Sequence, residues 1–330
     1  MDEAYSGKTL LVTGGAGSIG SEIVKDLVRR RGAKAIRVMD TNETGLFDLE
    51  NEVDSKLLRP LIGDIRDRNR IRMAMDGVDT VFHAAALKHV PLCEYNPFEA
   101  VKTNVEGTQN LLDAALECNV ARFITISTDK AVSPNNVMGA TKLLAERLTI
   151  AANGYKGARR SAFSVVRFGN VLNSRGSLLP VIKNQALNGQ SVTLTDERMT
   201  RFVMKVEDAV DLVLKAGALT KGGETFILKM PCIRTSDLMD VAIEGLAEKS
   251  GKAPVQVRNI GIRAGEKLHE TLMTDEEAAF AVDQGQMYVL DNMARIANGD
   301  GHRKTYSSEH GPYLSKGEIR ALLSDIDYFK

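Results

Sequence analysis

A glycine-rich turn directly after a short apolar run is the feature that most constrains the fold of this chain. The apolar run is Thr9–Thr13, and the turn reads Gly14-Gly15-Ala16-Gly17-Ser18-Ile19-Gly20 before a helical pattern begins. Glycine at 14 permits a tight turn, at 17 it lets backbone approach a phosphate, and at 20 it lets the helix pack on the strand. The helix N-terminus adds amide donors and a partial positive charge. The sequence therefore predicts a strand–turn–helix unit that binds a dinucleotide.

Short apolar runs alternate with amphipathic helical patterns throughout the first half of the chain. The expected strands are Thr9–Thr13, Ala35–Asp40, Leu57–Gly63, Thr80–His83, Arg122–Ser127 and Phe163–Phe168. The expected helices are Ser18–Arg31, Asp67–Met75, Pro97–Cys118 and Val137–Asn153. This alternation predicts an α/β fold with a Rossmann-type, doubly wound parallel sheet that helices cover on both faces.

The alternation of strands and helices stops after Phe168, where the polar loop Gly169–Ser177 begins. We expect an NAD-binding Rossmann domain at residues 1–168 and a smaller C-terminal α/β substrate domain at 169–330. A segment near 205–230 is expected to pack back on the first domain, because Val206–Ala218 has a helical pattern and Thr225–Leu228 reads as a strand.

Charge balance excludes some classes of partner. The 43 basic residues equal the 43 acidic ones, so the formal net charge is zero. A nucleic-acid or acidic-membrane partner would call for a basic surface. Neutrality also leaves little electrostatic repulsion between copies, so we expect a homo-oligomer, a dimer or larger.

Cysteine and apolar content predict a cytoplasmic enzyme. Cys93, Cys118 and Cys232 are sparse, odd in number and far apart, which fits a reducing compartment. The N-terminal residues are polar and lack the apolar stretch that is typical of a signal peptide, and no run approaches the roughly 18 apolar residues of a membrane span. The five histidines lack metal-ligand spacing, so no metal site is expected.

The choice of cofactor depends on Asp40, which ends the second expected strand 20 residues after Gly20. A carboxylate there accepts hydrogen bonds from both hydroxyls of an adenosine ribose and repels a 2′-phosphate. Thr41, Asn42 and Glu43 follow, with no arginine to receive such a phosphate. We therefore expect NAD rather than NADP. Asp64-Ile65, after the third strand, is expected to contact adenine, although a plain turn is an equal alternative.

The chemistry is expected around Thr128-Asp129-Lys130, at the end of the fifth strand. Met138 and Lys142 follow one helical turn apart, so they face the same side of a helix. Many nicotinamide-dependent enzymes of this plan carry Tyr-x-x-x-Lys at these two positions. Met138 cannot exchange a proton, and we expect Lys142 to hold a hydroxyl of the nicotinamide ribose.

Taken together, these motifs resemble those of extended short-chain dehydrogenase/reductases that act on nucleotide sugars. Within them the chain is most similar to the UDP-N-acetylglucosamine 4,6-dehydratases of polysaccharide and glycosylation pathways. The resemblance covers nearly the full length. The matching stretches are Thr13–Gly20, His83-Ala84-Ala85-Ala86-Leu87-Lys88-His89-Val90-Pro91, Thr103-Asn104, Ser127–Lys130, Met138–Lys142, Arg167–Asn170, Arg198–Phe202 and Gly265-Glu266-Lys267.

The resemblance implies that a hydride leaves carbon 4 of the sugar, water is eliminated across carbons 5 and 6, and the hydride returns to carbon 6. It assigns protonation of the departing oxygen to Asp129, removal of the carbon-5 proton to Lys130, and a hydrogen bond to the carbon-4 oxygen to Thr128. We expect burial, the ketone and Lys142 to lower the pKa of Lys130. Met138 leaves the base for carbon-4 oxidation unassigned, and Asp129, acting through Thr128 or a water, is preferred.

The resemblance also implies a UDP-sugar substrate and its binding residues. The substrate-binding candidates are Lys88, Asn170, Asn173, Arg175, Ser177, Arg201, Arg263 and Glu266. The cofactor candidates are Gly14, Gly17, Ser18, Ile19, Gly20, Asp40, Asp64, Ile65, Ala84, Ala85, Ala86 and Lys142. A surface lysine is an equal alternative for Lys88, as is an exposed glutamate for Glu266.

Two alternatives stay open beside the dehydratase. A nucleotide-sugar 4-epimerase also oxidises carbon 4 but needs no acid–base pair for elimination, so Asp129-Lys130 argues against it. A nucleotide-sensing protein without turnover is favoured only by Met138. For the dehydratase, the stretch Gly265–Glu270 favours inversion at carbon 5 slightly over retention.

Overall fold

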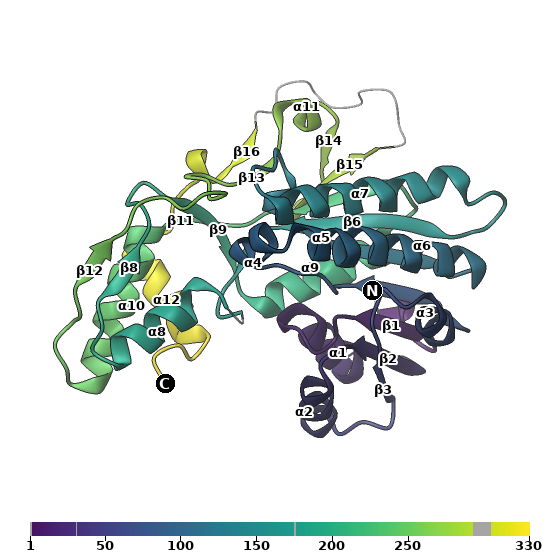
Figure 1. Ribbon diagram of the computed structural model, residues 1–330, viewed down its shortest axis with the longest axis horizontal. Helices are drawn as coiled ribbons and strands as arrows, with labels where there is room; N and C mark the ends of the chain where they lie inside the picture. Colours follow the sequence, from purple (N-terminus) through teal and green to yellow (C-terminus); the bar gives the residue numbers. More distant parts are fainter. Residues whose placement is uncertain (1, 31, 175, 293–304) are drawn as a thin grey trace.

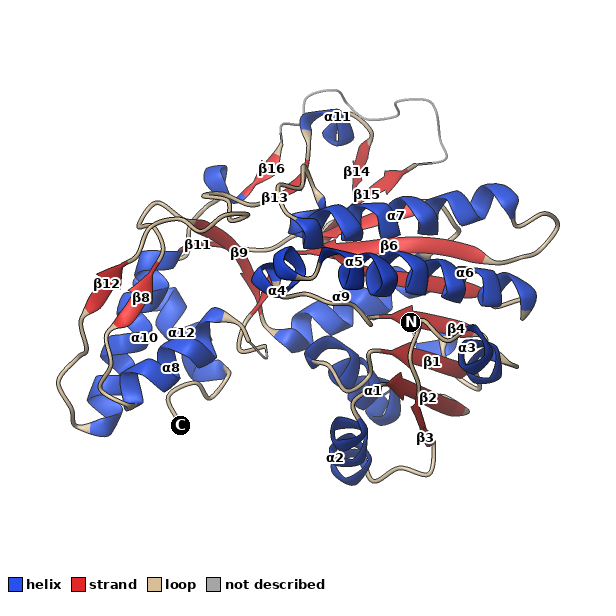
Figure 2. Cartoon of the chain, viewed as in Figure 1, coloured by secondary structure: helices blue, strands red, loops and turns tan. Residues whose placement is uncertain are grey.

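The protein is described by a computed structural model that covers residues 2–30, 32–174, 176–292 and 305–330. Its centre is a nine-stranded sheet (Figures 1 and 2). In spatial order the strands are β14 (Ala281–Asp283), β15 (Met287–Asp291), β10 (Glu224–Leu228), β6 (Ala162–Phe168), β5 (Arg122–Thr128), β4 (Thr80–His83), β1 (Thr9–Thr13), β2 (Ala35–Asp40) and β3 (Leu58–Ile62). Strands β3 to β10 run parallel, whereas β15 and β14 are antiparallel to their neighbours. The expected α/β fold with a doubly wound parallel sheet is confirmed.

Helices cover both faces of this sheet. They are α1 (Ser18–Arg30), α2 (Glu43–Val53), α3 (Arg68–Met75), α4 (Val90–Tyr95), α5 (Pro97–Val101), α6 (Gly107–Glu117), α7 (Val137–Tyr155) and α9 (Val206–Leu219). Helix α1 packs beside α9, and α6 packs between α3 and α7. Figure 1 shows α6 and α7 in front of the central strands, with α9 behind them.

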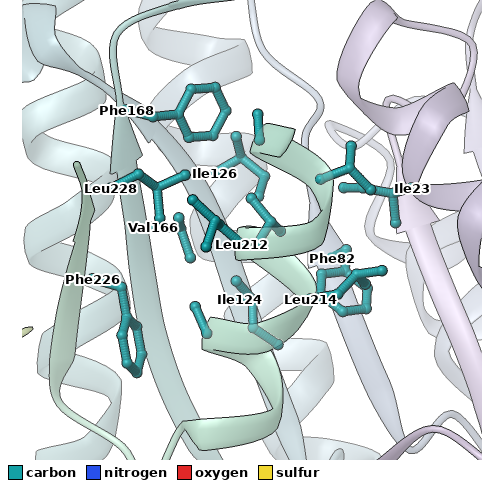
Figure 3. Close-up of a cluster of buried hydrophobic side chains, with 14 of the residues drawn as sticks. Ile23, Phe82, Ile124, Ile126, Val166, Phe168, Leu212, Leu214, Phe226 and Leu228 are labelled. Atoms are coloured by element: carbon teal, nitrogen blue, oxygen red, sulfur yellow. The ribbon is translucent and has the colours of Figure 1, made fainter. Parts of the chain in front are cut away.

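Alternation along the central strands divides the buried side chains between two cores. Leu10 and Val12 of β1 belong to the core on the α9 side, whereas Leu11 belongs to the opposite core. Successive side chains of a strand point to opposite faces, so an apolar strand of a covered sheet serves both cores. Figure 3 shows Leu212 and Leu214 of α9 packed among the sheet side chains of the first core.

The expected helix Pro97–Cys118 is interrupted. Helix α5 ends at Val101, a π-helical turn spans Lys102–Glu106, and α6 begins at Gly107. The turn directs Asn104 inward, where its side chain accepts from Leu87 N at 2.8 Å and donates to Leu87 O and Thr141 Oγ1, both at 3.0 Å. The π-turn therefore fixes the loop after β4, which borders the cleft described below.

The remaining elements form a second layer of structure beside the sheet (Figure 2). Helices α8 (Leu178–Leu187), α10 (Thr235–Ser250) and α12 (Lys316–Asp325) pack together around buried side chains such as Ile182, Leu238 and Tyr328. In a three-stranded sheet β9 (Thr200–Met204) lies between β7 (Asn170–Val171) and β11 (Cys232–Arg234). Two-stranded sheets pair β8 (Val192–Leu194) with β12 (Val257–Asn259) and β13 (Thr271–Met273) with β16 (Tyr306–Ser307). The short helices are Asp2–Ala4, Asp129–Ala131 (η3), α11 (Asp275–Ala278) and Ser308–His310 (η4).

Several elements beyond residue 168 belong to the main sheet. Strand β10 pairs with β6, and strands β15 and β14 extend the same edge. The division into domains at residue 168 stays a prediction. Among the described helices, none is long and apolar enough to cross a membrane.

Candidate active site

The carboxyl ends of the parallel strands border a cleft of ≈ 680 Å³. Ligands bind at this edge in doubly wound sheets, because the loops that follow the strands converge there. The following predicted site residues line the cleft: Gly14, Gly17, Ser18, Ile19, Gly20, Asp40, Asp64, Ile65, Ala84, Ala85, Ala86, Lys88, Thr128, Lys130, Met138, Lys142, Asn170 and Ser177. The fold therefore brings most of the predicted site together, while the role of each residue stays a prediction.

Other predicted residues do not line the cleft. The Arg201 guanidinium donates to the carbonyls of Thr200, Lys267 and Leu268 at 2.7–3.0 Å. Arg263 is exposed, and its backbone N–H donates to the Glu266 carboxylate at 3.2 Å. Asn173 lies in the loop after β7 with a positive φ of 54°. Arg175 lies outside the described residues.

Gly14 and Gly20 of the glycine turn have no room for a side chain. Gly14 has a φ of 69°, and a Cβ there would lie 2.5 Å from the backbone nitrogen of Ala85. A Cβ on Gly20, in the first turn of α1, would lie 2.2 Å from the carbonyl oxygen of Gly14. The backbone is therefore open toward the cleft directly in front of a helix N-terminus. This cradle fits the pyrophosphate of a dinucleotide.

Asp40 holds the glycine turn as well as facing the cleft. Its Oδ2 accepts from Ala16 N at 3.0 Å and its Oδ1 from Asn42 N at 2.9 Å. Each carboxylate oxygen has a second lone pair, so two ribose hydroxyls can still be accepted. Asp64, farther along this edge, pairs with the Arg66 guanidinium at 2.8 Å, and this hydrogen bond lowers the pKa of Asp64.

The predicted catalytic stretch forms a hydrogen-bonded group at the end of β5. Thr128 Oγ1 donates to Asp129 Oδ1 at 2.8 Å, and Lys130 Nζ donates to the same oxygen at 3.0 Å. Asp129 is fully buried, with Gly169 against its other oxygen, whereas Thr128 and Lys130 line the cleft. Asp129 is therefore connected to the cleft through its two neighbours.

The expectation that the pKa of Lys130 is lowered is wrong for the resting structure. Burial does act to lower this pKa, but the carboxylates of Asp129 and Glu270 outweigh it and raise the pKa above its ordinary value. The Glu270 Oε1 atom lies 3.7 Å from Lys130 Nζ. The sequence missed this contact, because the two residues are far apart in the chain.

Lys142 and Met138 lie on the α7 side of the cleft. Lys142 Nζ donates to the carbonyl of Ile126 at 2.6 Å, and burial lowers its pKa to about 8. Met138 is buried against Cys93 and Ala100. Lys142 thus stays close to the end of β5, where a nicotinamide ribose would lie, and Met138 contributes an apolar surface.

The loop between β12 and β13 is attached by hydrogen bonds next to this catalytic group. The Asn136 side chain caps α7 by accepting from Gly139 N at 2.7 Å, and it donates to the carbonyl of Gly265 at 2.9 Å. Lys267 Nζ donates to the carbonyl of Val132 at 2.8 Å. Glu270 reaches Lys130 from the end of this loop. Among the described residues, no cluster of His, Cys, Asp and Glu could hold a metal ion.

Comparison with known proteins agrees with this geometry. Residues 10–292 match the sequence pattern of the polysaccharide biosynthesis protein family. This span includes the glycine turn, the end of β5 and Glu270. The chain belongs to this family. Membership places it among the extended short-chain dehydrogenase/reductases, as the sequence motifs indicated.

Relatives of this chain carry the names of different activities. An uncharacterized membrane protein of Methanocaldococcus jannaschii is 57% identical over 98% of this chain and 97% of its own length. A UDP-N-acetylglucosamine 4,6-dehydratase (inverting) of Campylobacter jejuni is 39% identical over 98% of this chain and 100% of its own. A UDP-glucose 4-epimerase of Rickettsia bellii is also 39% identical, over 97% of this chain and 96% of its own. Identity alone therefore does not separate the two reactions.

Solved structures of the same fold bind NAD. Pen from Bacillus thuringiensis is 40% identical and superposes with a TM-score of 0.92 over 97% of this chain and 98% of its own. The dTDP-glucose 4,6-dehydratase DesIV of Streptomyces venezuelae, solved with NAD bound, has a TM-score of 0.70 at 25% identity, over 79% of this chain and 86% of its own.

Proposed function

We propose that this protein catalyses the NAD-dependent 4,6-dehydration of UDP-N-acetylglucosamine to a UDP-2-acetamido-2,6-dideoxy-4-hexulose, for glycan or polysaccharide biosynthesis. One observation carries the proposal: Lys130 and a buried acid, Asp129, share a hydrogen bond at 3.0 Å at the sheet edge where substrate would bind. Elimination of water needs one group that removes a proton and one that supplies a proton, and this pair offers both.

The cofactor is assigned to the glycine turn, the residues Ala84, Ala85 and Ala86 after β4, and the neighbouring Asp40 and Lys142. When bound, NAD accepts a hydride from carbon 4 of the sugar and returns it to carbon 6. Asp40 accepts the adenosine ribose hydroxyls, and its charge favours NAD over NADP. Lys142, which burial keeps easily deprotonated, donates to the nicotinamide ribose.

In the first step the proton on the carbon-4 oxygen moves to Asp129. Thr128 Oγ1 accepts that proton and passes its own to Asp129 Oδ1, along the existing 2.8 Å hydrogen bond. Thr128 is the residue that touches the carbon-4 oxygen, which explains why a methionine is tolerated at 138. The ketone that results acidifies the proton on carbon 5.

In the second step Lys130 removes the carbon-5 proton and Asp129 returns its proton to the departing carbon-6 oxygen. Protonation of Asp129 in the first step removes a negative charge that holds the pKa of Lys130 high. Burial, which acts in the opposite direction, then favours the neutral amine. One of the two carboxylates that raise the pKa of Lys130 at rest is thus neutralised just before Lys130 acts.

A 4-epimerase is the second candidate, because a relative with that name is as similar as the dehydratase. Epimerisation reverses carbon 4 and leaves the carbon-5 proton in place. It offers no use for a cleft-lining lysine that is hydrogen-bonded to a buried acid, so the dehydratase is preferred. The slight preference for inversion over retention at carbon 5 rests on the Gly265–Glu270 stretch.

The UDP-sugar is assigned to the part of the cleft beside Lys130. Asn170, which accepts from Lys130 Nζ at 3.4 Å, lines the cleft together with Lys88 and Ser177. The remaining candidates are proposed on resemblance alone; they are Asn173, Arg175, Arg201, Arg263 and Glu266. A homo-oligomer and a cytoplasmic location stay predictions from the sequence.

The proposal is tested by incubating the NAD-loaded protein with UDP-N-acetylglucosamine in deuterated water and following the sugar by NMR. We expect a 6-deoxy-4-keto product with deuterium at carbon 5, and its configuration reports inversion or retention. A carbon-4 epimer without loss of water would establish the epimerase instead.

A variant at Lys130 tests the base. Lys130→Arg keeps the positive charge beside Asp129 but cannot lose a proton at neutral pH. We expect carbon-5 exchange to fall by about 10²–10⁴-fold, while NAD binding is retained. Lys249→Arg, an exposed change on α10, is the matched control. Wild-type exchange in Lys130→Arg would exclude Lys130 as the base.

A further inference from the structure

Glu270 is a buried carboxylate beside the catalytic group that no step above uses. It immediately precedes β13, and only 3% of its surface is exposed. Its Oε1 lies 3.7 Å from Lys130 Nζ, and its buried Oε2 has no hydrogen-bond partner. A buried polar atom without a partner costs free energy, so its presence calls for an explanation.

The backbone around Glu270 is held firmly while its side chain extends toward Lys130. Its N–H donates to Ser308 Oγ at 2.9 Å, and its carbonyl accepts from Ser308 N at 2.8 Å and from Ser307 Oγ at 3.3 Å. Contacts on both sides of the backbone fix the direction of the side chain. Glu270 is therefore aimed at Lys130 by an element distant in sequence.

Lys130 needs a proton acceptor other than Asp129. An ammonium has three N–H donors, and those of Lys130 face Asp129 Oδ1 at 3.0 Å, Asn170 Oδ1 at 3.4 Å and the Glu270 carboxylate. Under the proposed function, Asp129 already holds the proton from the carbon-4 oxygen when Lys130 must become neutral. An amide oxygen does not accept a proton at neutral pH, so Glu270 is the remaining acceptor.

We propose that Glu270 is the positioning residue that takes the proton of Lys130 and thereby converts the lysine into the base for carbon 5. This inference rests on the proposed dehydration and adds to it a residue that touches neither substrate nor cofactor. The transfer requires Lys130 Nζ to approach Glu270 Oε1 from 3.7 Å to hydrogen-bond distance.

The protons balance through one turnover. An N–H bond of Lys130 breaks and an O–H bond forms on Glu270, so the charge of the pair changes from a cation and an anion to two neutral groups. Lys130 next takes the carbon-5 proton, while the Asp129 proton leaves in the water. When the hydride returns to carbon 6, the Lys130 ammonium supplies a proton to carbon 5 and becomes neutral. Glu270 then returns its proton to Lys130, so the pair ends as an ammonium and a carboxylate, and no added acid is consumed.

The surroundings of Glu270 fit an acceptor of this kind. Burial raises the pKa of Glu270, the charge of Asp129 raises it further, and the cations Lys130, Arg201 and Lys267 oppose these effects. These four charged groups come from η3, β9 and the loop before Glu270, the elements that face its side chain.

The test separates oxidation of carbon 4 from removal of the carbon-5 proton. Glu270→Gln keeps the shape of the side chain but cannot hold a proton. With UDP-N-acetylglucosamine and NAD, we expect this variant to reduce the bound cofactor and to accumulate the 4-keto sugar, while carbon-5 exchange in deuterated water falls about 10²-fold or more. A merely structural role would slow both steps together.

The controls keep the outcome decisive. Glu276→Gln, an exposed change on α11, should behave as wild type. If Glu270→Gln does not fold, Glu270→Asp applies the same test, because a shorter side chain lies farther from Lys130. Wild-type exchange in a folded Glu270 variant, or equal loss of both steps, overturns the role of Glu270. If the wild-type protein itself forms no 6-deoxy product, the proposed function fails instead, and the two failures are told apart by that measurement.

Discussion

Thr128 is the single side chain that connects the buried Asp129 carboxylate to the carbon-4 oxygen in the proposed reaction. Its hydroxyl lies 2.8 Å from Asp129 Oδ1, and no tyrosine is present at 138 to replace it. We expect Thr128→Val, which has the same shape without the hydroxyl, to lower the rate of cofactor reduction by about 10²–10⁴-fold. Rapid-mixing absorbance of the reduced nicotinamide measures this step.

Thr128→Ser is the matched control, because it restores the hydroxyl and should recover most of the rate. Thr128→Val should block the first step, whereas Glu270→Gln should allow it, so the two variants differ in the step that fails. Undiminished cofactor reduction in Thr128→Val would assign the carbon-4 proton to another group, such as a bound water.

The titration of Lys142 makes the stability of the folded protein depend on pH. Its pKa is lowered from 10.5 to about 8 by burial, and each unit is worth about 1.4 kcal/mol. Below about pH 8 the folded protein buries a charged amine, so Lys142 destabilises it by up to about 3 kcal/mol. Between pH 8 and 10.5 the folded form releases its proton first, and this penalty fades.

Lys142→Met removes the titrating group and tests this reasoning. The free energy of unfolding of the wild-type protein without NAD should rise relative to that of Lys142→Met by up to about 3 kcal/mol from pH 8 to 10.5. Urea unfolding at several pH values measures the difference, and groups common to both proteins cancel. A difference that is constant across this range would mean that the pKa of Lys142 is not lowered.

At the scale of elements, the strand–turn–helix unit depends on the absence of a Cβ at Gly20. A methyl group there would meet backbone atoms of Gly14 and Gly15 at 2.2–2.8 Å, so the turn must shift. We expect Gly20→Ala to cost about 1–3 kcal/mol of stability and to weaken NAD binding at least tenfold. Gly154→Ala, at an exposed site of α7 with open space around it, should instead stabilise by about 0.5–1 kcal/mol. Calorimetry with and without NAD checks both, and equal NAD affinity in the two variants would contradict the cradle.

Elements with local signals could be predicted from the sequence, and elements set by distant contacts could not. The strand–helix alternation indicated β1 to β6, because each strand is an apolar run bounded by turns. The π-turn at Lys102–Glu106 could not be predicted, because it accompanies the contact of Asn104 with Leu87, a residue outside the helix. Strand β15 joins the sheet through antiparallel pairing with β10, and the three-residue strand β14 joins through β15, so neither belongs to the strand–helix alternation.

The same distinction holds for the site at the scale of the whole molecule. The glycine turn and Thr128–Lys130 could be recognised because their residues are adjacent in sequence. The pKa of Lys130 was expected to fall, because the sequence shows Lys142 nearby but not Glu270, which arrives from 140 residues away. The electrostatics of a buried group depend on every charge that the fold brings close, and the sequence order does not contain that information.

At the scale of the whole molecule, Asn136 connects the main sheet region to the loop between β12 and β13. Its side chain caps α7 and donates a hydrogen bond to the Gly265 carbonyl. We expect Asn136→Ala to cost about 1 kcal/mol of stability through loss of the cap. It should also release the loop that carries Arg263 and Glu266, and so weaken binding of the UDP-sugar. Ser315→Ala removes the equivalent cap of α12, far from this contact, and should cost a similar amount of stability with no effect on binding. Unfolding curves and titration with UDP compare the two. Equal UDP affinity in both variants would mean that binding of UDP does not depend on the attachment of this loop to α7 through Asn136.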